Sequence, residues 1–340
     1  MAHDKNRANQ PDQPRAPVDK VQSALEILVH NATEEFGFIP RDVYKGVLRL
    51  PETKMNHEKA VDALDYPSLV AFVKNFPEKH QIADFSHRVV AVRPMRSLVG
   101  RDRWFVDFKS TRIRLQVMKK MESAEINQIR ETFGSLRHTG ERSSLAGWCF
   151  EAFAHRVLSG GWEGPAPQLT HMPSKQHDPP VFKTDPSSQP SSFEPCTRTT
   201  KQIKITKEFK DVTLDKGVYY KPAAVNNPLF DSFTIDRGLD GVVVISIFQM
   251  TISEKHGGSS DGYLLVRNLI DRVRELLNDK AAEPEVRYIL VCPNDTQERQ
   301  WNMPNGWNDS CIQRGHRGKA FCIRLPILLL PRTSLPKLTT

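Results

Sequence analysis

Residues 231–256, DSFTIDRGLDGVVVISIFQMTISEKH, decide the fold expected of this chain. The stretch begins with a short mixed strand, passes through a turn that contains Gly238 and Gly241, and continues as the apolar run 242–248. Two strand-like segments joined by a glycine-containing turn predict a buried β-hairpin. The apolar run is too short to be a transmembrane helix.

The position of the turn determines which residues of the hairpin face each other. If the turn is centred on Asp240, antiparallel pairing places Asp231 opposite Gln249. Opposed residues point to the same face, and Thr251 shares it because side chains alternate along a strand. A carboxylate, an amide oxygen and a hydroxyl then gather at the open end of the hairpin, and such hard oxygen ligands suit Mg²⁺. Polar residues at strand ends also commonly face solvent, and that alternative stays open.

Length, charge and cysteine usage limit the class of protein. The 340 residues accommodate two domains of ordinary size. The net charge of +8 indicates an anionic partner, most simply nucleic acid, although acidic proteins and membrane surfaces also attract such a charge. The five cysteines form no CxxC pair, which favours free thiols in a reducing compartment.

The two ends of the chain are expected to be tails. Residues 1–17 are polar and proline-containing, lack the apolar core of a Sec signal peptide and are predicted to be disordered. Residues 327–340 form a C-terminal tail without an assigned role. Because no apolar run reaches membrane-spanning length, we expect a soluble nuclear or cytoplasmic protein with no membrane partner.

Residues 18–140 are expected to form a helical region with a basic, two-stranded wing. Apolar residues at helical spacing predict a first helix that ends near His30, and three short helices follow between residues 34 and 76. Strands are expected at 89–92 and 104–108, joined by a basic loop and followed by another helix. Helices followed by such a wing are compatible with a winged-helix-like arrangement.

Positive charge is concentrated between Arg88 and Lys120, where ten Lys and Arg residues stand against two acidic ones. Basic residues beside aromatic ones suit binding to a phosphate backbone with occasional base stacking. The alternative is a solvated face that keeps the protein soluble. The residues expected to contact nucleic acid are Arg96, Arg101, Arg103, Trp104, Arg112 and Arg114.

The second half of the chain predicts an α/β sandwich with a mixed sheet. Residues 147–161 form a largely buried helix on which Glu151 and His155 lie one turn apart. A carboxylate on such a helix needs a partner or a chemical role, and a structural Glu–His pair is the more common explanation. The proline-rich segment 162–200 is expected to be a long loop or linker inserted into this domain. Strands including the hairpin, a helix over 261–278 and further strands complete the sandwich.

The order αβββαβ resembles the PD-(D/E)xK restriction-endonuclease-like nuclease superfamily. Glu151 lies on the first helix, Asp231 begins the second core strand, and Gln249-x-Thr251 stands in place of E-x-K at the end of the third. The phrases AGWCFEAFAHRVLSGG, YYKPAAVNNPLFDSF, FQMTISEKH and RYILVCP are similar to the nuclease-like module of fungal Crinkler and retrotransposon-hot-spot effectors. The resemblance covers about residues 145–326.

The resemblance implies a protein of mobile-element origin that acts on or near nucleic acid in the nucleus. In these effectors the nuclease module accompanies a P-loop NTPase, and residues 36–136 are similar to the region between the two. This chain contains no GxxxxGK[ST] sequence, so no ATP binding or hydrolysis is expected. The chain looks like a version without the NTPase core, or like a truncated gene product.

The resemblance also implies a metal site and a catalytic set. Mg²⁺ would be held by Asp231, Gln249 and Glu151, together with the backbone carbonyl of Met250. The superfamily lysine orients the attacking water, and Thr251 occupies its position here. The residues expected to act in catalysis are Glu151, Asp231, Gln249, Thr251 and Lys255.

Two neighbouring residues add alternatives to this set. Lys221 is a second candidate, beside Lys255, for the missing lysine. His256 could transfer a proton or contact phosphate, although an ordinary loop histidine is the more common case.

Three functions remain open from the sequence. The first is a metal-dependent nuclease, which would lose cleavage on Asp231→Ala. The second is a catalytically inactive, DNA-associated module that keeps the nuclease fold, favoured by Thr251 and by Gln249 in place of Glu. The third is a protein-interaction module whose basic patch binds an acidic partner, and affinity for duplex DNA that barely changes with salt would indicate it.

Overall fold

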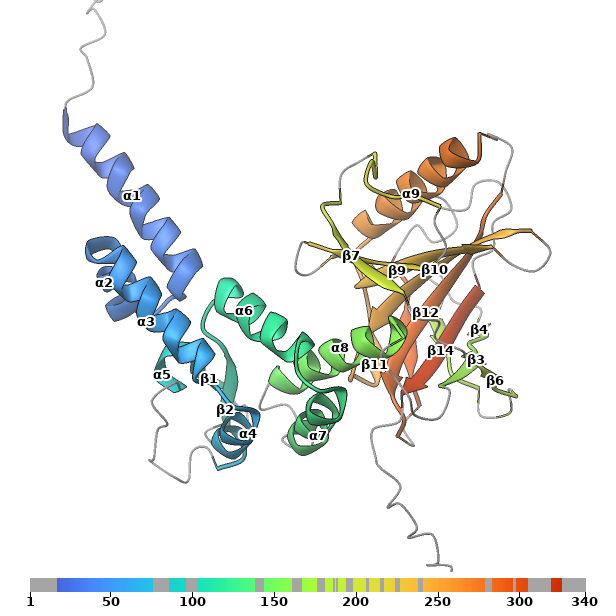
Figure 1. The fold of residues 1–340 in the computed structure, drawn as a ribbon, viewed down its shortest axis with the longest axis horizontal. Coiled ribbons are helices and arrows are strands. Elements are labelled where there is room, and N and C mark those ends of the chain that lie inside the picture. The colour runs from blue at the N-terminus through green and yellow to red at the C-terminus, as the bar shows by residue number, and fades with distance from the viewer. Residues whose placement is uncertain are drawn as a thin grey trace, which may run out of the picture. The chain divides into compact units, whose positions relative to one another are not determined.

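The computed structural model has an α+β fold with helices and mixed sheets (Figure 1). It describes residues 17–75, 86–95, 103–137, 144–160, 167–175, 181–185, 187, 189–193, 198–205, 208–214, 217–223, 227–237, 241–278, 283–295, 298–304 and 319–325. The tails predicted at the two ends lie outside these residues, apart from Pro17. Within the described ranges, no helix combines the length and apolar character needed to cross a membrane.

Contacts divide the described chain into two compact units. One unit comprises residues 17–64, 86–91 and 108–117, and the other comprises the rest. The division passes through two strands and a helix of the N-terminal region.

The first unit is helical. Its elements are α1 (Pro17–Phe36), α2 (Pro40–Leu48), α3 (Leu50–Asp62), α5 (Ser86–Val89) and the beginning of α6 (Thr111–Glu122). The predicted end of α1 at His30 is wrong, because the helix continues to Phe36 and stops at Gly37. Gly37 has a φ of +82°, and a Cβ there would collide with the carbonyl oxygen of Lys109. Glycine therefore provides both the helix stop and the close approach.

The N-terminal half contains two strands and two further helices besides the elements of this unit. β1 (Val90–Met95) and β2 (Arg103–Phe108) form the predicted two-stranded sheet. α4 (Tyr66–Asn75) and α7 (Ile126–Leu136) belong to the second unit, where α7 packs against both α4 and α8 (Leu145–Leu158).

The second unit is built on an eight-stranded mixed sheet. The strand order is β6, β3, β14, β12, β10, β9, β8, β7. The strands are β3 (Gln168–His171), β6 (Ser191–Ser192), β7 (Thr199–Ile203), β8 (Val218–Pro222), β9 (Ser232–Arg237), β10 (Val243–Met250), β12 (Glu285–Pro293) and β14 (Lys319–Leu325). A smaller sheet contains β4 (Ser174–Lys175), β5 (Val181–Lys183), β11 (Lys255–His256) and β13 (Gln300–Asn302).

The hairpin of β9 and β10 has the predicted register. Ser232 lies opposite Phe248, and Arg237 lies opposite Val243. β10 also pairs in parallel with β12, and all its residues are buried. A central strand covered on both faces explains why its sequence is a continuous apolar run.

The proline-rich segment 162–200, predicted to be a loop, differs in the structure. β3 adds to the large sheet by pairing antiparallel with β14, and β5 pairs antiparallel with β13 in the small sheet. β3 has four residues and β5 has three, and their partners β14 and β13 lie far away in the sequence. Such short segments give no periodic pattern, so tertiary pairing decides their structure.

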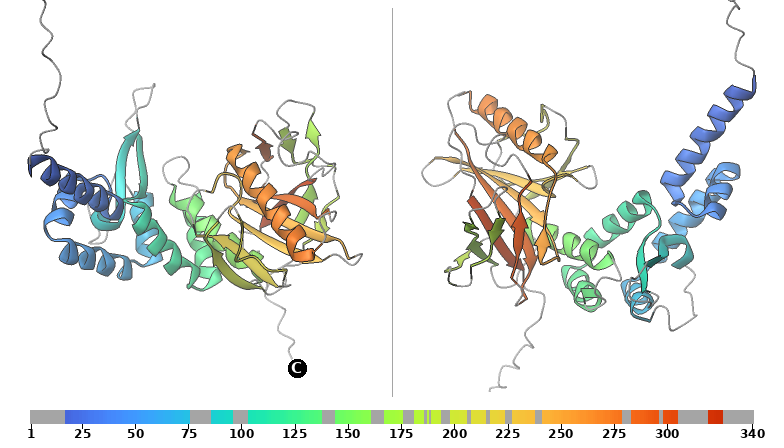
Figure 2. Two further views of the ribbon diagram at one scale, coloured as in Figure 1. Left: turned by 90° about the horizontal axis from the view of Figure 1, so that it is seen from above. Right: turned by 180° about the vertical axis from the view of Figure 1, so that it is seen from behind.

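Helices α8 and α9 (Asp261–Leu277) cover opposite faces of the large sheet (Figures 1 and 2). Ile245 and Ile247 share a core with Val266 and Ile270 of α9. The alternate residues of the strands face α8, where a tyrosine is hydrogen-bonded to a histidine of that helix and a serine is hydrogen-bonded to the tyrosine. Burial of each large apolar side chain in this core contributes about 1.5–3 kcal/mol.

Candidate active site

Asp231 immediately precedes β9, at the open end of the hairpin. Its Oδ2 accepts two hydrogen bonds, from Nε2 of Gln249 and from the backbone N–H of Met250, both at 2.7 Å. The backbone N–H of Asp231 donates to the carbonyl oxygen of Phe248 at 2.8 Å. The predicted proximity of Asp231 and Gln249 is therefore a direct side-chain contact.

A second carboxylate acts on Asp231 from helix α8. Burial, followed by the negative charge of Glu151, raises the pKa of Asp231 well above its ordinary value. The hydrogen bonds from Met250 and Gln249 and the charge of Lys221 act in the opposite direction. Glu151 and Asp231, here called the acidic pair, therefore favour a proton on Asp231. A cation that approached both carboxylates would displace that proton.

Lys221 on β8 brings positive charge to the acidic pair. Its ammonium pairs with Glu122 at the end of α6, and its side chain is 17% exposed. Lys255, the other candidate, is exposed in β11 of the smaller sheet. Of the two lysines, Lys221 has the stronger effect on the pKa of Asp231.

Thr251, which stands at the position of the superfamily lysine, is buried in the turn after β10. Its Oγ1 accepts the backbone N–H of Ser253 at 3.1 Å, and its own N–H donates to the carbonyl oxygen of Val291 at 2.9 Å. A hydroxyl used in this way fixes the local backbone. It supplies no positive charge to the acidic pair.

A chain of buried polar side chains links α8 to β8 and β9. Nδ1 of His155 lies 2.8 Å from Oη of Tyr219, which lies 2.6 Å from Oγ of Ser232. Nε2 of His155 lies 3.6 Å from Oε1 of Glu151. Burial lowers the pKa of His155 and raises that of Tyr219, so both groups are neutral near pH 7.

Sequence reasoning identified Glu151 and His155 but missed the two hydroxyl groups. Tyr219 and Lys221 are two residues apart on β8, so they share a face of the strand. That spacing, in the sequence VYYKP, could have linked Tyr219 to the candidate lysine. The contact with Ser232 depends on the pairing of β8 with β9, which no local pattern shows.

The donor set of this site suits a hard cation only if amide and carbonyl oxygens take part. Among the residues that the structure describes, no cluster of three or more His, Cys, Asp and Glu side chains could hold a metal ion. The acidic pair provides two carboxylates, whereas Gln249 and Met250 present N–H groups to Asp231, so their oxygens would join a metal site only after the Gln249 amide rotates and through the Met250 carbonyl group. The repulsion between these two half-buried carboxylates is what a divalent cation would offset.

His256 lies in the smaller sheet, where its ring is edge-on to that of Trp301, with centroids 6.3 Å apart. Burial lowers the pKa of His256 to about 4, so the ring is neutral near pH 7. His256 is therefore a neutral histidine that packs against Trp301 as part of the fold.

The predicted nucleic-acid contacts are described only in part. The side chains that lie outside the described part of the structure are those of Arg96, Arg101, Arg103 and Trp104. Arg112 forms an ion pair with Glu35 at 2.7 Å, so its charge is partly offset. Arg114 is half-buried on the same helix, α6.

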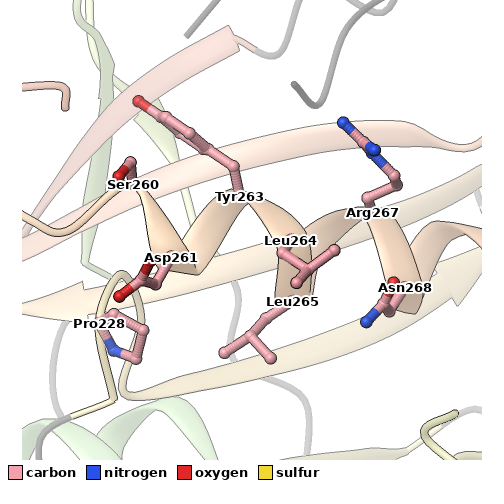
Figure 3. Close-up of a pocket in the computed structure, with 8 residues that line it drawn as sticks. All are labelled: Pro228, Ser260, Asp261, Tyr263, Leu264, Leu265, Arg267 and Asn268. Atoms are coloured by element: carbon pink, nitrogen blue, oxygen red, sulfur yellow. The ribbon is translucent and has the colours of Figure 1, made fainter. Parts of the chain in front are cut away.

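A separate surface pocket of about 410 Å³ lies at the start of α9 (Figure 3). Its lining residues are Pro228, Ser260, Asp261, Tyr263, Leu264, Leu265, Arg267 and Asn268. Tyr263 and Arg267 project to one side of the helix, and Oη of Tyr263 donates to the carbonyl oxygen of Pro304 at 2.9 Å. None of the candidate catalytic residues lines this pocket.

Comparisons with known proteins assign no family to this chain. No family model, no curated protein and no solved structure matches it. The chemistry of the site therefore rests on its own residues.

Proposed function

We propose that the chain is a metal-dependent nucleic-acid phosphodiesterase of the restriction-endonuclease-like type. The observation that carries the proposal is the acidic pair, in which burial and the negative charge of Glu151 on α8 raise the pKa of Asp231 at the end of the hairpin, while the charge of Lys221 lowers it. The order α8, β8, β9, β10, α9, β12 supports it, because the superfamily resemblance implies the order αβββαβ.

Four residues would hold one Mg²⁺ in this site. They are Asp231, Glu151, Met250 through its carbonyl oxygen, and Gln249 after its amide rotates to present Oε1. Two carboxylates, with waters completing the shell, match the ligand preference of Mg²⁺. The bound ion would polarise the phosphodiester and lower the pKa of a water molecule.

Lys221 takes the role that the resemblance gives to a lysine. Its charge acts on Asp231 while its ammonium pairs with Glu122. In the reaction it would orient the attacking water and offset the negative charge that develops on the phosphate. Thr251 has no such role, because its hydroxyl stabilises a turn.

Nucleic acid is the substrate class that the charge and the resemblance favour. The net charge of +8 attracts phosphates, and β1 and β2 follow helices in the manner of a wing. The similarity to the nuclease module of Crinkler and retrotransposon-hot-spot effectors points to the same class and to action in the nucleus or cytoplasm.

A second candidate is a catalytically inactive, DNA-associated module. Gln249 and Thr251 stand where the superfamily has a carboxylate and a lysine, and Gln249 presents Nε2 rather than oxygen to Asp231. Gln249 weakens metal binding relative to a carboxylate, and Thr251 lacks the charge with which the superfamily lysine orients the attacking water. A protein-interaction module is the third candidate.

Cleavage assays with the purified chain separate the three candidates. Plasmid DNA, single-stranded DNA and RNA are incubated with Mg²⁺ or Mn²⁺, with EDTA as the metal-free control. We expect metal-dependent cleavage that falls at least about 100-fold in Asp231→Asn. Asp236→Asn is the matched control, because Asp236 lies at the other end of β9 and pairs with Arg198 at 2.8 Å.

Each alternative outcome has a distinct meaning. Equal cleavage by the wild type and Asp231→Asn would reject the site. No cleavage together with salt-sensitive DNA binding would indicate the inactive module. No cleavage and no salt-sensitive binding would indicate the protein-interaction module.

A further inference from the structure

Three buried groups connect the two elements that carry the acidic pair. Ser232 directly follows Asp231 on β9, Tyr219 lies on the neighbouring strand, and His155 is one turn after Glu151 on α8. The exposed fractions are 0% for Ser232, 0% for Tyr219 and 5% for His155. Water therefore does not compete for their hydrogen bonds, and each hydrogen needs an acceptor within the chain.

The available hydrogens allow two arrangements of this chain. In one, Ser232 donates to Tyr219, Tyr219 donates to Nδ1 of His155, and the ring hydrogen sits on Nε2. In the other, every donor is reversed, and Nε2 presents a lone pair. A carboxylate oxygen of Glu151 lies 3.6 Å from Nε2, and among the described contacts Nε2 has no hydrogen-bond partner.

The charge of Glu151 decides between the two arrangements. An N–H is attracted to a carboxylate, whereas a lone pair on Nε2 would be repelled by it. The first arrangement is therefore favoured, and all its hydrogens run in one direction, from β9 to α8. Consecutive hydrogen bonds aligned in this way strengthen one another in a buried site.

We propose that Ser232, Tyr219 and His155 form a directional hydrogen-bond relay that aims Nε2–H of His155 at Glu151 and so positions this carboxylate against Asp231. The metal-holding purpose of the relay rests on the proposed function, whereas its hydrogen-bond direction does not. His155 and Tyr219 are thus positioning residues, because they act through Glu151.

The chain offers a matched pair of variants for testing the relay. Tyr219→Phe deletes the central hydroxyl and keeps the ring. Tyr220→Phe deletes an equally buried hydroxyl from the next residue, whose Oη bonds to Thr213 at 3.0 Å. Both variants lose a buried hydrogen bond, so a general loss of stability is common to the two.

The first readout is the tautomer of His155, measured by ¹⁵N NMR on histidine-labelled protein without metal. The resonances of this ring are assigned by their loss in His155→Gln. The relay predicts a hydrogen on Nε2 and the chemical shift of a hydrogen-bonded acceptor for Nδ1. Tyr219→Phe should shift the Nδ1 resonance towards that of a free acceptor, and Tyr220→Phe should leave it unchanged. A hydrogen on Nδ1 in the wild type would overturn the relay.

The second readout is the affinity for Mn²⁺, measured by isothermal titration. Loss of a residue that orients a ligand typically weakens metal binding about 10- to 100-fold. We expect a loss of at least about tenfold in Tyr219→Phe and none in Tyr220→Phe. Equal affinities in the two variants would overturn the positioning role. If the wild type binds no Mn²⁺, the proposed metal site fails, and the tautomer alone decides the relay.

Discussion

The side-chain amide of Gln249 donates to Oδ2 of Asp231 across 2.7 Å, at the open end of the β9–β10 hairpin. The same oxygen receives the N–H of Met250, so the carboxyl group is held in one orientation. Burial and Glu151 nevertheless raise its pKa. The site therefore holds an acid group in an environment that disfavours its charge, and this cost makes the account testable without any substrate.

Removal of the charge of Asp231 is expected to stabilise the metal-free protein. Because the pKa of Asp231 is raised in the folded state, the free energy of unfolding falls as the pH rises above about 4. Asp231→Asn removes this loss while its amide oxygen can accept both hydrogen bonds. We expect the variant to exceed the wild type by about 1 kcal/mol at pH 8 and to equal it near pH 4, measured by urea unfolding.

An Asp231→Asn variant that is less stable than the wild type at pH 8 would contradict this prediction. So would a stability difference that does not change between pH 4 and pH 8. Either result would mean that the acidic pair imposes no cost on the fold.

Stabilisation by Mg²⁺ is expected to increase with pH. The ion must displace the proton that the raised pKa of Asp231 favours, so binding is weaker in acid. A ligand at ten times its Kd stabilises the folded state by about 1.4 kcal/mol. Thermal unfolding should show a larger Mg²⁺-induced rise in Tm at pH 8 than at pH 5.5. Asp231→Asn should show no rise, and a rise that is independent of pH would argue against this site.

Gln249→Glu is expected to lower the stability of the metal-free protein and to raise its affinity for metal. The change removes the amide donor to Asp231 and adds a third negative charge, so metal-free stability should fall by about 1–2 kcal/mol at pH 8. The affinity for Mn²⁺ in calorimetry should rise about tenfold, because an anionic oxygen replaces a neutral one. Gln300→Glu adds the same charge in the smaller sheet and should leave the affinity unchanged. Weaker Mn²⁺ binding by Gln249→Glu would count against a metal at Asp231.

The two candidate lysines predict opposite outcomes in a cleavage assay. Lys221→Met should reduce the rate about 100-fold or more, because the charge beside Asp231 is lost. It should not weaken Mn²⁺ binding, because loss of the Lys221 ammonium removes a positive charge that repels the metal ion. Lys255→Met should leave both properties unchanged, because Lys255 is exposed in the smaller sheet. Loss of cleavage in Lys255→Met alone would reverse this assignment.

The central hairpin could be predicted because its information is local. The turn with Gly238 and Gly241 and the β-branched run fix the register, and the register brings Asp231 to Gln249. The end of α1 could not be predicted from periodicity. The helix stops at Gly37 because only glycine can approach Lys109 so closely, and that contact belongs to the tertiary structure.

The candidate site was predictable in its carboxylates and less so in its other parts. Glu151 and Asp231 follow from element order, whereas the choice of Lys221 over Lys255 depends on which sheet each joins. The hydroxyl of Tyr219 meets Ser232 only through the register of β8 with β9. Pairing between separate strands cannot be predicted from the residues of one short segment.

The most direct test of the account is isothermal titration of Mn²⁺ into the wild type, Glu151→Gln, Asp231→Asn and the double variant at pH 8. We expect one Mn²⁺ per chain in the wild type and at least about a tenfold weaker affinity in each single variant. Wild-type affinity in either single variant, or no binding by the wild type, would contradict the claim that Glu151 and Asp231 share one divalent cation.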